Sequence, residues 1–213
     1  MSGFFITFEG IEGCGKTTQI LLLRDFLRTR NYDAVLTREP GGTSIGDQIR
    51  KVLLLSENKS MRPITELLLY AAARNQHVEE IIMPSLEVGK VVLCDRYADA
   101  TTAYQGAARK IKNEFLTELH DIATGGLQPN LTILFNCPAN LGLERAKVRN
   151  EEEKKTGVED RFEEELLDFH ERVRAGYLNI AKKEPNRVKV IDATLPPKAV
   201  HQRVIIEVMK LLQ

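Results

Sequence analysis

The chain has 213 residues, of which 43% are hydrophobic, and this length suits one domain whose core needs no disulfide or metal. Its 30 basic and 30 acidic side chains cancel, so the composition indicates neither nucleic acid nor an anionic membrane as a partner. Apolar runs stay short of the roughly 20 residues that span a bilayer, and the three scattered cysteines suit reduced thiols, so we expect a cytoplasmic protein.

The first predicted elements enclose a glycine-rich loop. A β-branched and aromatic run at 4–9 predicts a strand, and apolar spacing at 19–27 predicts a helix. Between them, Gly10 to Thr17 read GIEGCGKT, the pattern G-x-x-x-x-G-K-T. Three glycines let backbone N–H groups and the positive end of the helix point at one place, where a polyphosphate fits. We therefore predict a phosphate-binding loop, with Lys16 facing the outer phosphates and the Thr17 hydroxyl able to hold Mg²⁺.

Four further apolar runs predict the other strands, and helical spacing fills the gaps between them. The strands are expected at 33–37, 91–94, 131–135 and 188–192. The helices are expected at about 44–55, 64–86, 113–124, 140–149, 162–183 and 197–212. Pro84 is expected to end or kink the second of them. This alternation predicts an α/β fold of the P-loop type, a five-stranded parallel sheet with helices on both faces, whose ligands gather at the carboxyl ends of the strands.

Two charged residues follow the strand at 91–94. An apolar strand that ends in an acid often accompanies a phosphate loop, because a carboxylate such as Asp95 can hold the metal ion directly or through water. Helix capping or ion pairing is the alternative role for Asp95. Arg96 can hold a pair of phosphate oxygens with its planar fork, which implies a second phosphate at this end of the sheet.

Other charged and aromatic residues leave two interpretations open. Arg38, Arg50 and Arg74 are candidate ligands, although each taken alone fits a surface ion pair better. Tyr70 and Arg74 lie four residues apart on one predicted helix, so a ring that can stack on a base shares a face with a fork that can reach its carbonyl. Periodicity alone favours a core aromatic residue beside an arginine that reaches solvent. The four histidines are separated in the sequence, which favours surface or capping roles over metal binding.

Five stretches, in this order and over nearly the whole chain, resemble the bacterial type of thymidylate kinase. They are the loop from Glu9 to Thr18, REPGGT at 38–43, YAAARNQH at 70–77, Asp95-Arg96-Tyr97 with AYQG at 103–106, and Asp192-Ala193-Thr194. The resemblance implies transfer of the terminal phosphoryl group of ATP to dTMP, giving dTDP, with Mg²⁺. It also implies a homodimer formed through packed helices.

The resemblance further implies roles for single residues. On the donor side, ATP would be held by Gly10, Ile11, Glu12, Gly13, Cys14, Gly15, Lys16, Thr17 and Thr18, with the adenine beside Asp192, Ala193 and Thr194, and the metal at Thr17 and Asp95. Arg96, with Arg38 or Arg50, would hold the dTMP phosphate, and Glu12 would face the acceptor sugar or the metal. Arg74 would read the thymine carbonyl edge, and Tyr104 would sit where a 2'-hydroxyl would clash. The rest of the acceptor site would comprise Glu39, Pro40, Tyr70, Thr101 and Gln105.

Three positions depart from the family pattern. Tyr70 stands where a phenylalanine commonly stacks on thymine, and Ala100 stands where a serine is common. Gly13 occupies the position of a catalytic arginine in the eukaryotic type. The charge that neutralises the transition state must therefore come from elsewhere.

The sharply polar run at 150–157 predicts a loop between two helices. Arg145 and Arg149 precede this run and Arg161 follows it, the layout expected of a lid at about 149–161 that folds over ATP and, in the bacterial type, carries the missing arginine. We favour Arg149 as the catalytic residue because it lies nearest the polar run. The alternative is that these arginines form surface pairs with neighbouring glutamates.

Two other functions compete with this interpretation. Another nucleoside monophosphate or deoxynucleoside kinase would share the loop and Asp95-Arg96, but Arg74 and Tyr104-Gln105 argue against a different base pocket. A nucleotide-dependent switch or regulatory ATPase that binds a partner protein would carry a guanine-reading N-K-x-D motif or a large exposed apolar surface, and the sequence lacks the motif. We therefore predict a thymidylate kinase whose catalytic residues are Lys16, Arg149, Glu12 and Arg96.

Overall fold

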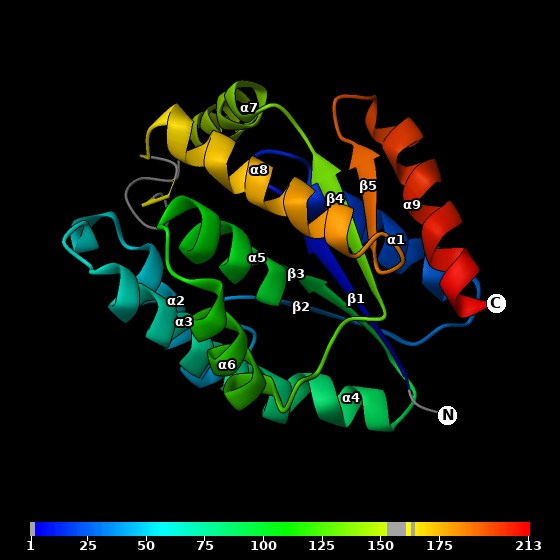
Figure 1. Cartoon of the computed structure of the whole chain (residues 1–213). Helices are drawn as coiled ribbons and strands as arrows, with labels where there is room; N and C mark the ends of the chain where they lie inside the picture. Colours follow the sequence, from blue (N-terminus) through cyan, green and yellow to red (C-terminus); the bar gives the residue numbers. More distant parts are fainter. Residues whose placement is uncertain (1–2, 153–160, 163–164) are drawn as a thin grey trace.

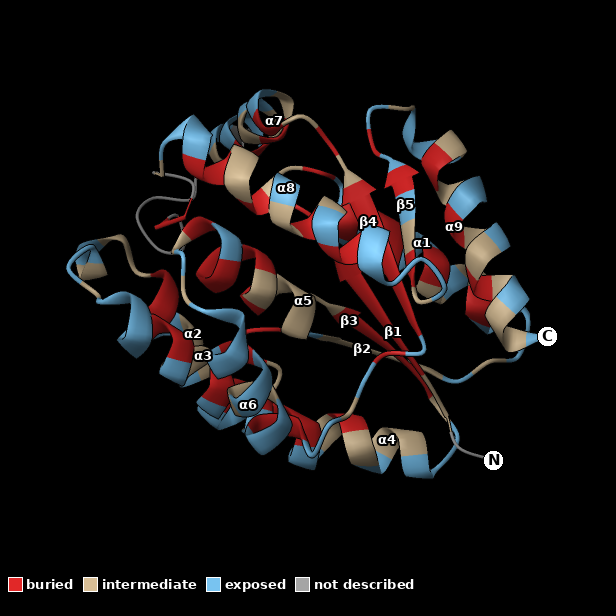
Figure 2. Ribbon diagram, in the orientation of Figure 1, coloured by how far each residue is buried: buried red, intermediate tan, exposed pale blue. Residues whose placement is uncertain are grey.

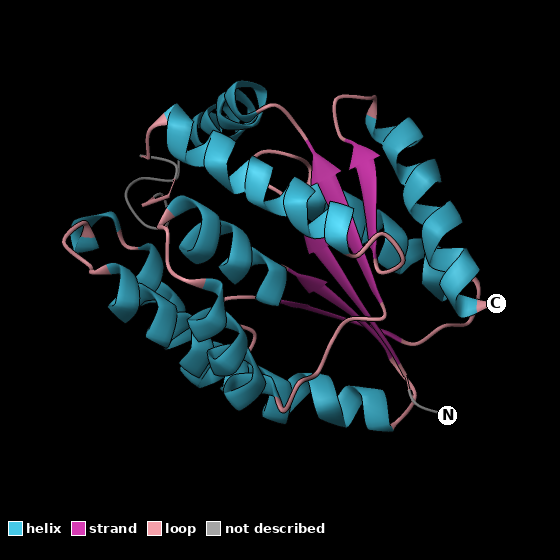
Figure 3. Cartoon of the chain, in the orientation of Figure 1, coloured by secondary structure: helices cyan, strands magenta, loops and turns pink. Residues whose placement is uncertain are grey.

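A parallel β-sheet forms the centre of the computed structural model, which describes residues 3–152, 161–162 and 165–213. The sheet has five strands in the order β2-β3-β1-β4-β5, and every neighbouring pair is parallel. The arrowheads in Figure 3 accordingly point to the same side of the molecule. The strands are β1 (Phe4–Glu9), β2 (Ala34–Arg38), β3 (Val91–Asp95), β4 (Leu131–Asn136) and β5 (Val188–Asp192). The predicted sheet is confirmed, with strand ends displaced by at most one residue.

Helices cover both faces of the sheet, which explains why its inner strands are apolar on both sides. In Figure 1, α8 crosses in front of the strands, whereas α1 lies behind them beside α9. Figure 2 shows buried residues along β1 and β4, while the edge strand β2 is only half-buried. The helices on the two faces are α1 (Lys16–Thr29), α2 (Ser44–Leu54), α3 (Pro63–His77), α4 (Met83–Glu87), α5 (Ala98–Thr101), α6 (Asn113–Thr124), α7 (Ala139–Glu152), α8 (Leu167–Lys183) and α9 (Pro197–Leu212).

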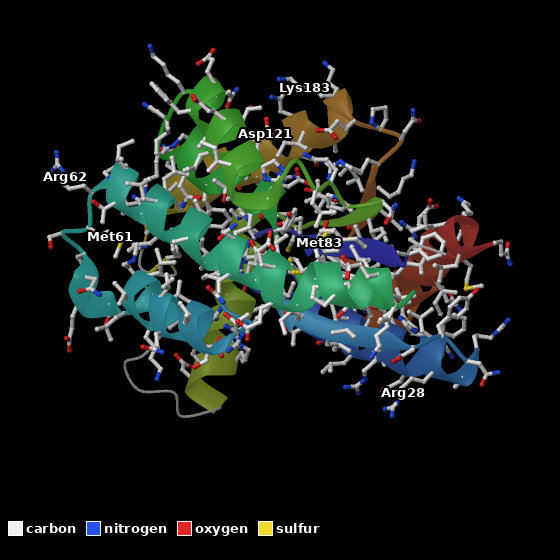
Figure 4. The ribbon with its side chains drawn as sticks, turned by 90° about the horizontal axis from the view of Figure 1, so that it is seen from below. Arg28, Met61, Arg62, Met83, Asp121 and Lys183 are labelled. Carbon is white, nitrogen blue, oxygen red and sulfur yellow. The ribbon has the colours of Figure 1, made fainter. Side chains whose placement is uncertain are left out.

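The helix predicted at 64–86 is divided into three parts. A π-helical turn, Val78–Ile82, joins α3 to α4, and Pro84 lies in the first turn of α4. Pro84 has no N–H group to donate to the preceding turn, so a widened turn before it agrees with the expected kink. Seen from below in Figure 4, this layer runs across the molecule from Arg62 to Met83.

Three other helix predictions need correction. The segment after β3 is helical, with α5 followed by a π-helical segment, Thr102–Ala108, where the sequence showed no regular apolar spacing. Helix α8 begins at Leu167 rather than at residue 162, because the backbone of Leu166 is extended. Helix α7 continues to Glu152, so the polar run does not begin as a loop at Asn150.

Candidate active site

The glycine-rich loop closes tightly around the start of α1. Gly10, Gly13 and Gly15 have φ angles of 139°, 66° and 90°, a region that side chains other than hydrogen rarely allow. A Cβ atom at Gly13 would also collide with the backbone carbonyl of Gly142 in α7. The loop therefore needs glycine both for its conformation and for its close approach to the neighbouring helix.

Lys16 is held by the loop that it belongs to. Its side chain is buried, and Nζ donates hydrogen bonds to the carbonyl oxygens of Gly10 at 3.1 Å and Ile11 at 3.0 Å. Lys16 also lines the cavity described below. The backbone of the loop thus fixes an ammonium group at the carboxyl end of β1.

Thr17 and Asp95 bring two oxygen ligands together beside the loop. The Thr17 hydroxyl donates to Asp95 Oδ2 at 3.3 Å, and both residues line the cavity. A hydroxyl and a carboxylate are ligands that Mg²⁺ accepts, and this metal commonly keeps waters and phosphate oxygens as its other ligands. Within the described ranges, no three His, Cys, Asp or Glu residues cluster as a metal site would need. The donor set therefore fits a magnesium ion shared with a bound phosphate better than a closed protein site.

One cavity of about 990 Å³ joins the loop to the residues predicted for the acceptor. It lies at the carboxyl ends of β1, β2 and β3, where Phe8 and Arg38 pair in register with Asp95. The predicted residues that line it are Glu12, Gly13, Cys14, Gly15, Lys16, Thr17, Thr18, Arg38, Glu39, Pro40, Arg50, Tyr70, Arg74, Asp95, Arg96, Thr101, Tyr104, Gln105 and Arg149. Sequence reasoning overlooked two apolar lining residues, Leu54 and Phe162.

The residues predicted beside the adenine do not line this cavity. Thr194 donates its backbone N–H and its hydroxyl to Asp192 Oδ1, at 2.9 Å and 2.6 Å, which closes a local turn after β5. Arg145, which does line the cavity, donates to the carbonyl oxygen of Ala193 at 3.0 Å. The adenine position therefore stays a prediction, with Arg145 as the link between this turn and the cavity.

Arg96 lies against the loop in a left-handed backbone conformation, with φ at 70°. Its guanidinium donates to the Gly10 carbonyl at 2.9 Å, to the Tyr177 hydroxyl at 3.2 Å and to Glu12 Oε1 at 3.0 Å. The Tyr97 N–H donates to Glu9 Oε1 at 2.7 Å, which holds the backbone directly after Arg96. The loop and the end of β3 are thus joined into one polar network.

The pKa values of two glutamates in this network are shifted in opposite directions. Burial raises the pKa of Glu9 to about 8, and the negative charge of Asp99 adds to the effect. Burial alone would also raise the pKa of Glu12, but the positive charge of Arg96 and the hydrogen bond and charge of His170 hold it well below the ordinary value. Of these two glutamates, Glu12 is therefore the one that remains charged next to the cavity.

A buried triad lies on the opposite wall of the cavity. Arg74 Nε donates to Glu39 Oε2 at 2.7 Å, and His77 Nδ1 lies 3.0 Å from Glu39 Oε1. Burial opposes the charge of Glu39, but Arg74 and His77 lower its pKa, and the charge of Glu39 keeps the pKa of Arg74 raised despite burial. Arg74 is 3% exposed, so it neither forms a surface ion pair nor reaches solvent beside a core tyrosine. His77 is fully buried, so the surface role expected for it is wrong, and so is the one expected for His170.

Glu66 forms a second buried hub, one turn before Tyr70 on α3. Gln105 donates to Glu66 at 2.8 Å, and Arg161 Nη1 lies 2.7 Å from the same carboxylate. Phe162 follows Arg161 and packs edge-on against the ring of Tyr104, with centroids 5.4 Å apart. The sequence shows no signal for this hub other than an acid at a core position of the predicted helix.

The three arginines considered for the lid lie in different surroundings. Arg149 is exposed at the cavity and donates to Asn150 Oδ1 at 3.2 Å. Arg145 is turned toward Ala193, and Arg161 is buried against Glu66. Residues 153–160, which form most of the predicted lid, lie outside the described part of the chain. Of the three, Arg149 combines exposure with a place on the cavity wall.

The fold and the cavity define a P-loop kinase, in which an anion-binding loop faces a second polar pocket across one space. A model of the family described as thymidylate kinase matches residues 8–204. The chain belongs to the thymidylate kinase family.

Individual relatives agree over almost the full length. A thymidylate kinase of Pelobacter propionicus is 49% identical over 208 residues, which are 98% of this chain and 94% of that protein. A thymidylate kinase of Geobacter sulfurreducens is 54% identical over 190 residues, 89% of each protein. The crystal structure of thymidylate kinase from Ehrlichia chaffeensis has a TM-score of 0.78 at 34% sequence identity, and the match covers 98% of this chain and 100% of that one. Within the described ranges, we find no helix with the length and apolar character of a membrane span.

Proposed function

We propose that this protein transfers the terminal phosphoryl group of ATP to dTMP, giving dTDP and ADP, and so serves dTTP supply for DNA synthesis. The observation that carries the proposal is the single cavity of about 990 Å³ that contains both the phosphate loop and a polar pocket lined by Tyr70, Arg74 and Arg96. Direct transfer between two nucleotides requires both phosphate groups in one space from which water can be excluded. The family assignment supports the same donor and acceptor.

On the donor side, the loop from Gly10 to Thr18 binds the ATP phosphates, and Asp192, Ala193 and Thr194 lie beside the adenine. Thr17 and Asp95 would hold Mg²⁺, whose positive charge would offset the charge that develops on the phosphate oxygens. This assignment is supported by the 3.3 Å hydrogen bond between the two residues at the cavity. Lys16 places its ammonium on the outer phosphates when it leaves the loop carbonyls.

On the acceptor side, Arg96 holds the dTMP phosphate together with Arg38 or Arg50. The ring of Tyr70 stacks on thymine, Arg74 faces the carbonyl edge of the base, and Tyr104 excludes a 2'-hydroxyl by its bulk. Arg74 is held by the buried carboxylate of Glu39 and Arg96 by the partly buried carboxylate of Glu12, which supports an acceptor site that is oriented before the substrate arrives. The pocket is completed by Glu39, Pro40, Thr101 and Gln105.

Charge in the transition state spreads over the oxygens of the transferring group, and cations that face it lower the barrier. Lys16 supplies one such cation from the loop. Arg149 supplies a second from the end of α7, within a single domain whose lid spans about 149–161. This role is supported by the exposure of Arg149 at the cavity.

A homodimer completes the proposed assembly. Large apolar side chains are exposed on two helices that pack side by side, α3 and α6. They are Ile64, Leu68, Phe115 and Ile122, which are 55%, 53%, 58% and 72% exposed. Exposed apolar side chains on neighbouring helices are typical of protein interfaces.

A coupled assay across the nucleoside monophosphates tests the function. With ATP and Mg²⁺, we expect dTMP to give the highest kcat/KM of all the acceptors. Equal or higher turnover with AMP, GMP or CMP would contradict the assignment of the base pocket. Absence of turnover with every acceptor would contradict the kinase function itself.

A further inference from the structure

One buried histidine faces the charged glutamate of the loop. His170 lies on α8 and is 0% exposed, and its Nδ1 atom is 3.2 Å from Glu12 Oε2. Both ring nitrogens of His170 and the Oε2 atom of Glu12 are buried, and within the described part of the chain none of them meets the geometry of a hydrogen bond, the 3.2 Å approach of Nδ1 to Oε2 included. The two groups are therefore each other's nearest available polar partner.

The other oxygen of Glu12 is already occupied. Glu12 Oε1 accepts a hydrogen bond from the Tyr104 hydroxyl at 2.5 Å and one from Arg96 Nη2 at 3.0 Å. A buried carboxylate oxygen left without a donor costs free energy, so Oε2 requires a hydrogen from His170. The N–H group on Nδ1 of His170 is the donor that can supply this hydrogen.

We propose that His170 is a positioning residue that holds Glu12 Oε2, and so keeps Oε1 where it orients both Arg96 and Tyr104 toward the acceptor. The proposal rests on the proposed function, because the acceptor side of the cavity is assigned there. His170 itself is not among the residues that line the cavity. It acts through Glu12, so its loss should weaken binding of the acceptor more than binding of ATP.

The placement of α8 supports this role. Tyr177, two helical turns after His170, accepts from Arg96 at 3.2 Å and donates to Glu9 at 2.8 Å. One face of α8 thus contacts both sides of Arg96, directly through Tyr177 and indirectly through His170 and Glu12. The ring of His170 packs edge-on against Phe169, with centroids 5.5 Å apart, which restricts its rotation.

Two substitutions separate a hydrogen-bond role from a packing role. In His170→Leu the donor is lost while most of the volume remains. In His170→Asn the side-chain amide nitrogen lies near the original position of Nδ1, so it can still donate to Glu12. His201→Leu on α9 is the matched control, because that histidine contacts neither Glu12 nor Arg96.

Steady-state kinetics of the purified full chain test the proposal. For His170→Leu we expect the KM for dTMP to rise at least about tenfold, with the KM for ATP changed less than about twofold. We also expect a smaller preference for dTMP over its 2'-hydroxyl analogue, because Tyr104 loses its fixed acceptor. His170→Asn should restore both quantities to within about threefold of wild type, and His201→Leu should match wild type.

Several outcomes would overturn the proposal. An unchanged KM for dTMP in folded His170→Leu would do so, and so would equal losses in the Leu and Asn variants. If His170→Leu fails to fold, His170→Gln replaces it, since its longer amide overshoots the Nδ1 position. Equal KM values for the Gln and Asn variants then refute the role. Wild-type turnover with dTMP separates these results from a failure of the proposed function.

Discussion

Two parts of the cavity hold their charged groups in different ways. We call them the loop wall, where Lys16 of the glycine-rich loop lies, and the α3 wall, where Arg74 of α3 lies. On the loop wall, Lys16 is held by two backbone carbonyls, at 3.1 Å and 3.0 Å. On the α3 wall, Arg74 is held by Glu39, which His77 contacts in turn. A lysine that leaves backbone carbonyls exposes no other charge, whereas a buried ion pair that loses one member leaves the other uncompensated. Substitution of Lys16 should therefore affect chemistry, whereas substitutions in the Arg74–Glu39 pair should affect stability as well.

The largest effect is expected for Lys16→Met. We expect kcat to fall by roughly 10³-fold or more, because a cation that faces the transferring phosphoryl group is removed. Thermal unfolding should change little, since Lys16 has no carboxylate partner within 4 Å in the described part of the chain. Lys90→Met, which removes only a surface pair with Asp33, is the control. Full activity of Lys16→Met would remove the phosphate loop from the mechanism.

The next effect tests the α3 wall through Glu39→Gln. Loss of the shared carboxylate leaves Arg74 buried without a counter-charge, and breaking such a pair costs about 3–5 kcal/mol. The free energy of unfolding in urea measures this cost, and KM for dTMP should rise with it. Asp168→Asn, which breaks an exposed pair with Arg172, should leave the unfolding free energy unchanged within error. Equal stabilities of the two variants would erase the distinction between the walls.

Arg149→Ala tests whether a second cation reaches the loop wall from α7. We expect turnover to fall at least about tenfold with little change in KM for dTMP, since the arginine acts on the transition state. Arg145→Ala and Arg161→Ala are compared in the same assay. A loss confined to either of them would move the role to that residue, and full activity of all three would exclude a lid arginine.

Tyr104 contacts the loop through its hydroxyl, which donates to Glu12, while its ring packs on Phe162. Tyr104→Ala should weaken the preference for dTMP over its 2'-hydroxyl analogue by about tenfold, because exclusion by bulk needs the ring. Tyr104→Phe keeps the ring but loses the hydrogen bond to Glu12, so its preference should fall by less than that of Tyr104→Ala. The ratio of kcat/KM values for the two acceptors measures both effects, and equal ratios in wild type and Tyr104→Ala would assign the exclusion to another residue.

The last prediction concerns the pH dependence of stability and Glu9, a buried carboxyl at the end of β1. Burial raises its pKa from 4.5 to about 8, so the folded state keeps a proton that the unfolded state has released between these values. Stability from this group is present below pH 4.5 and is lost as pH rises toward 8, by at most about 1.4 kcal/mol per pH unit. In Glu9→Gln, which does not titrate, stability should fall less steeply across this window. Parallel profiles for the two proteins would show that Glu9 is ionised when folded.

The local parts of the site could be predicted from the sequence. The loop needs glycines at fixed spacing, and the strands are continuous apolar runs, so neighbouring residues carry the signal. The order of the motifs also placed Asp95 and Arg96 at the same edge of the sheet as Lys16, because parallel strands end together. Helix ends were less accurate: α8 begins at Leu167, where an extended backbone stops a pattern that continues in the sequence.

The partners of the charged groups were decided by the tertiary structure alone. His170 lies 158 positions after Glu12 in the chain, and Arg161 lies 95 positions after Glu66, yet each pair meets within 3.2 Å. Periodicity states which face of a helix is buried but not which buried carboxylate a side chain will meet. Burial and its partners then set the chemistry, because Glu9 and Glu12 lie three residues apart, yet burial dominates the pKa of Glu9, whereas an ion pair with Arg96 and the neighbouring His170 hold down that of Glu12. From its own residues the sequence determines a P-loop kinase, and the packing of α3 and α8 determines which of its charges are held in place for the acceptor.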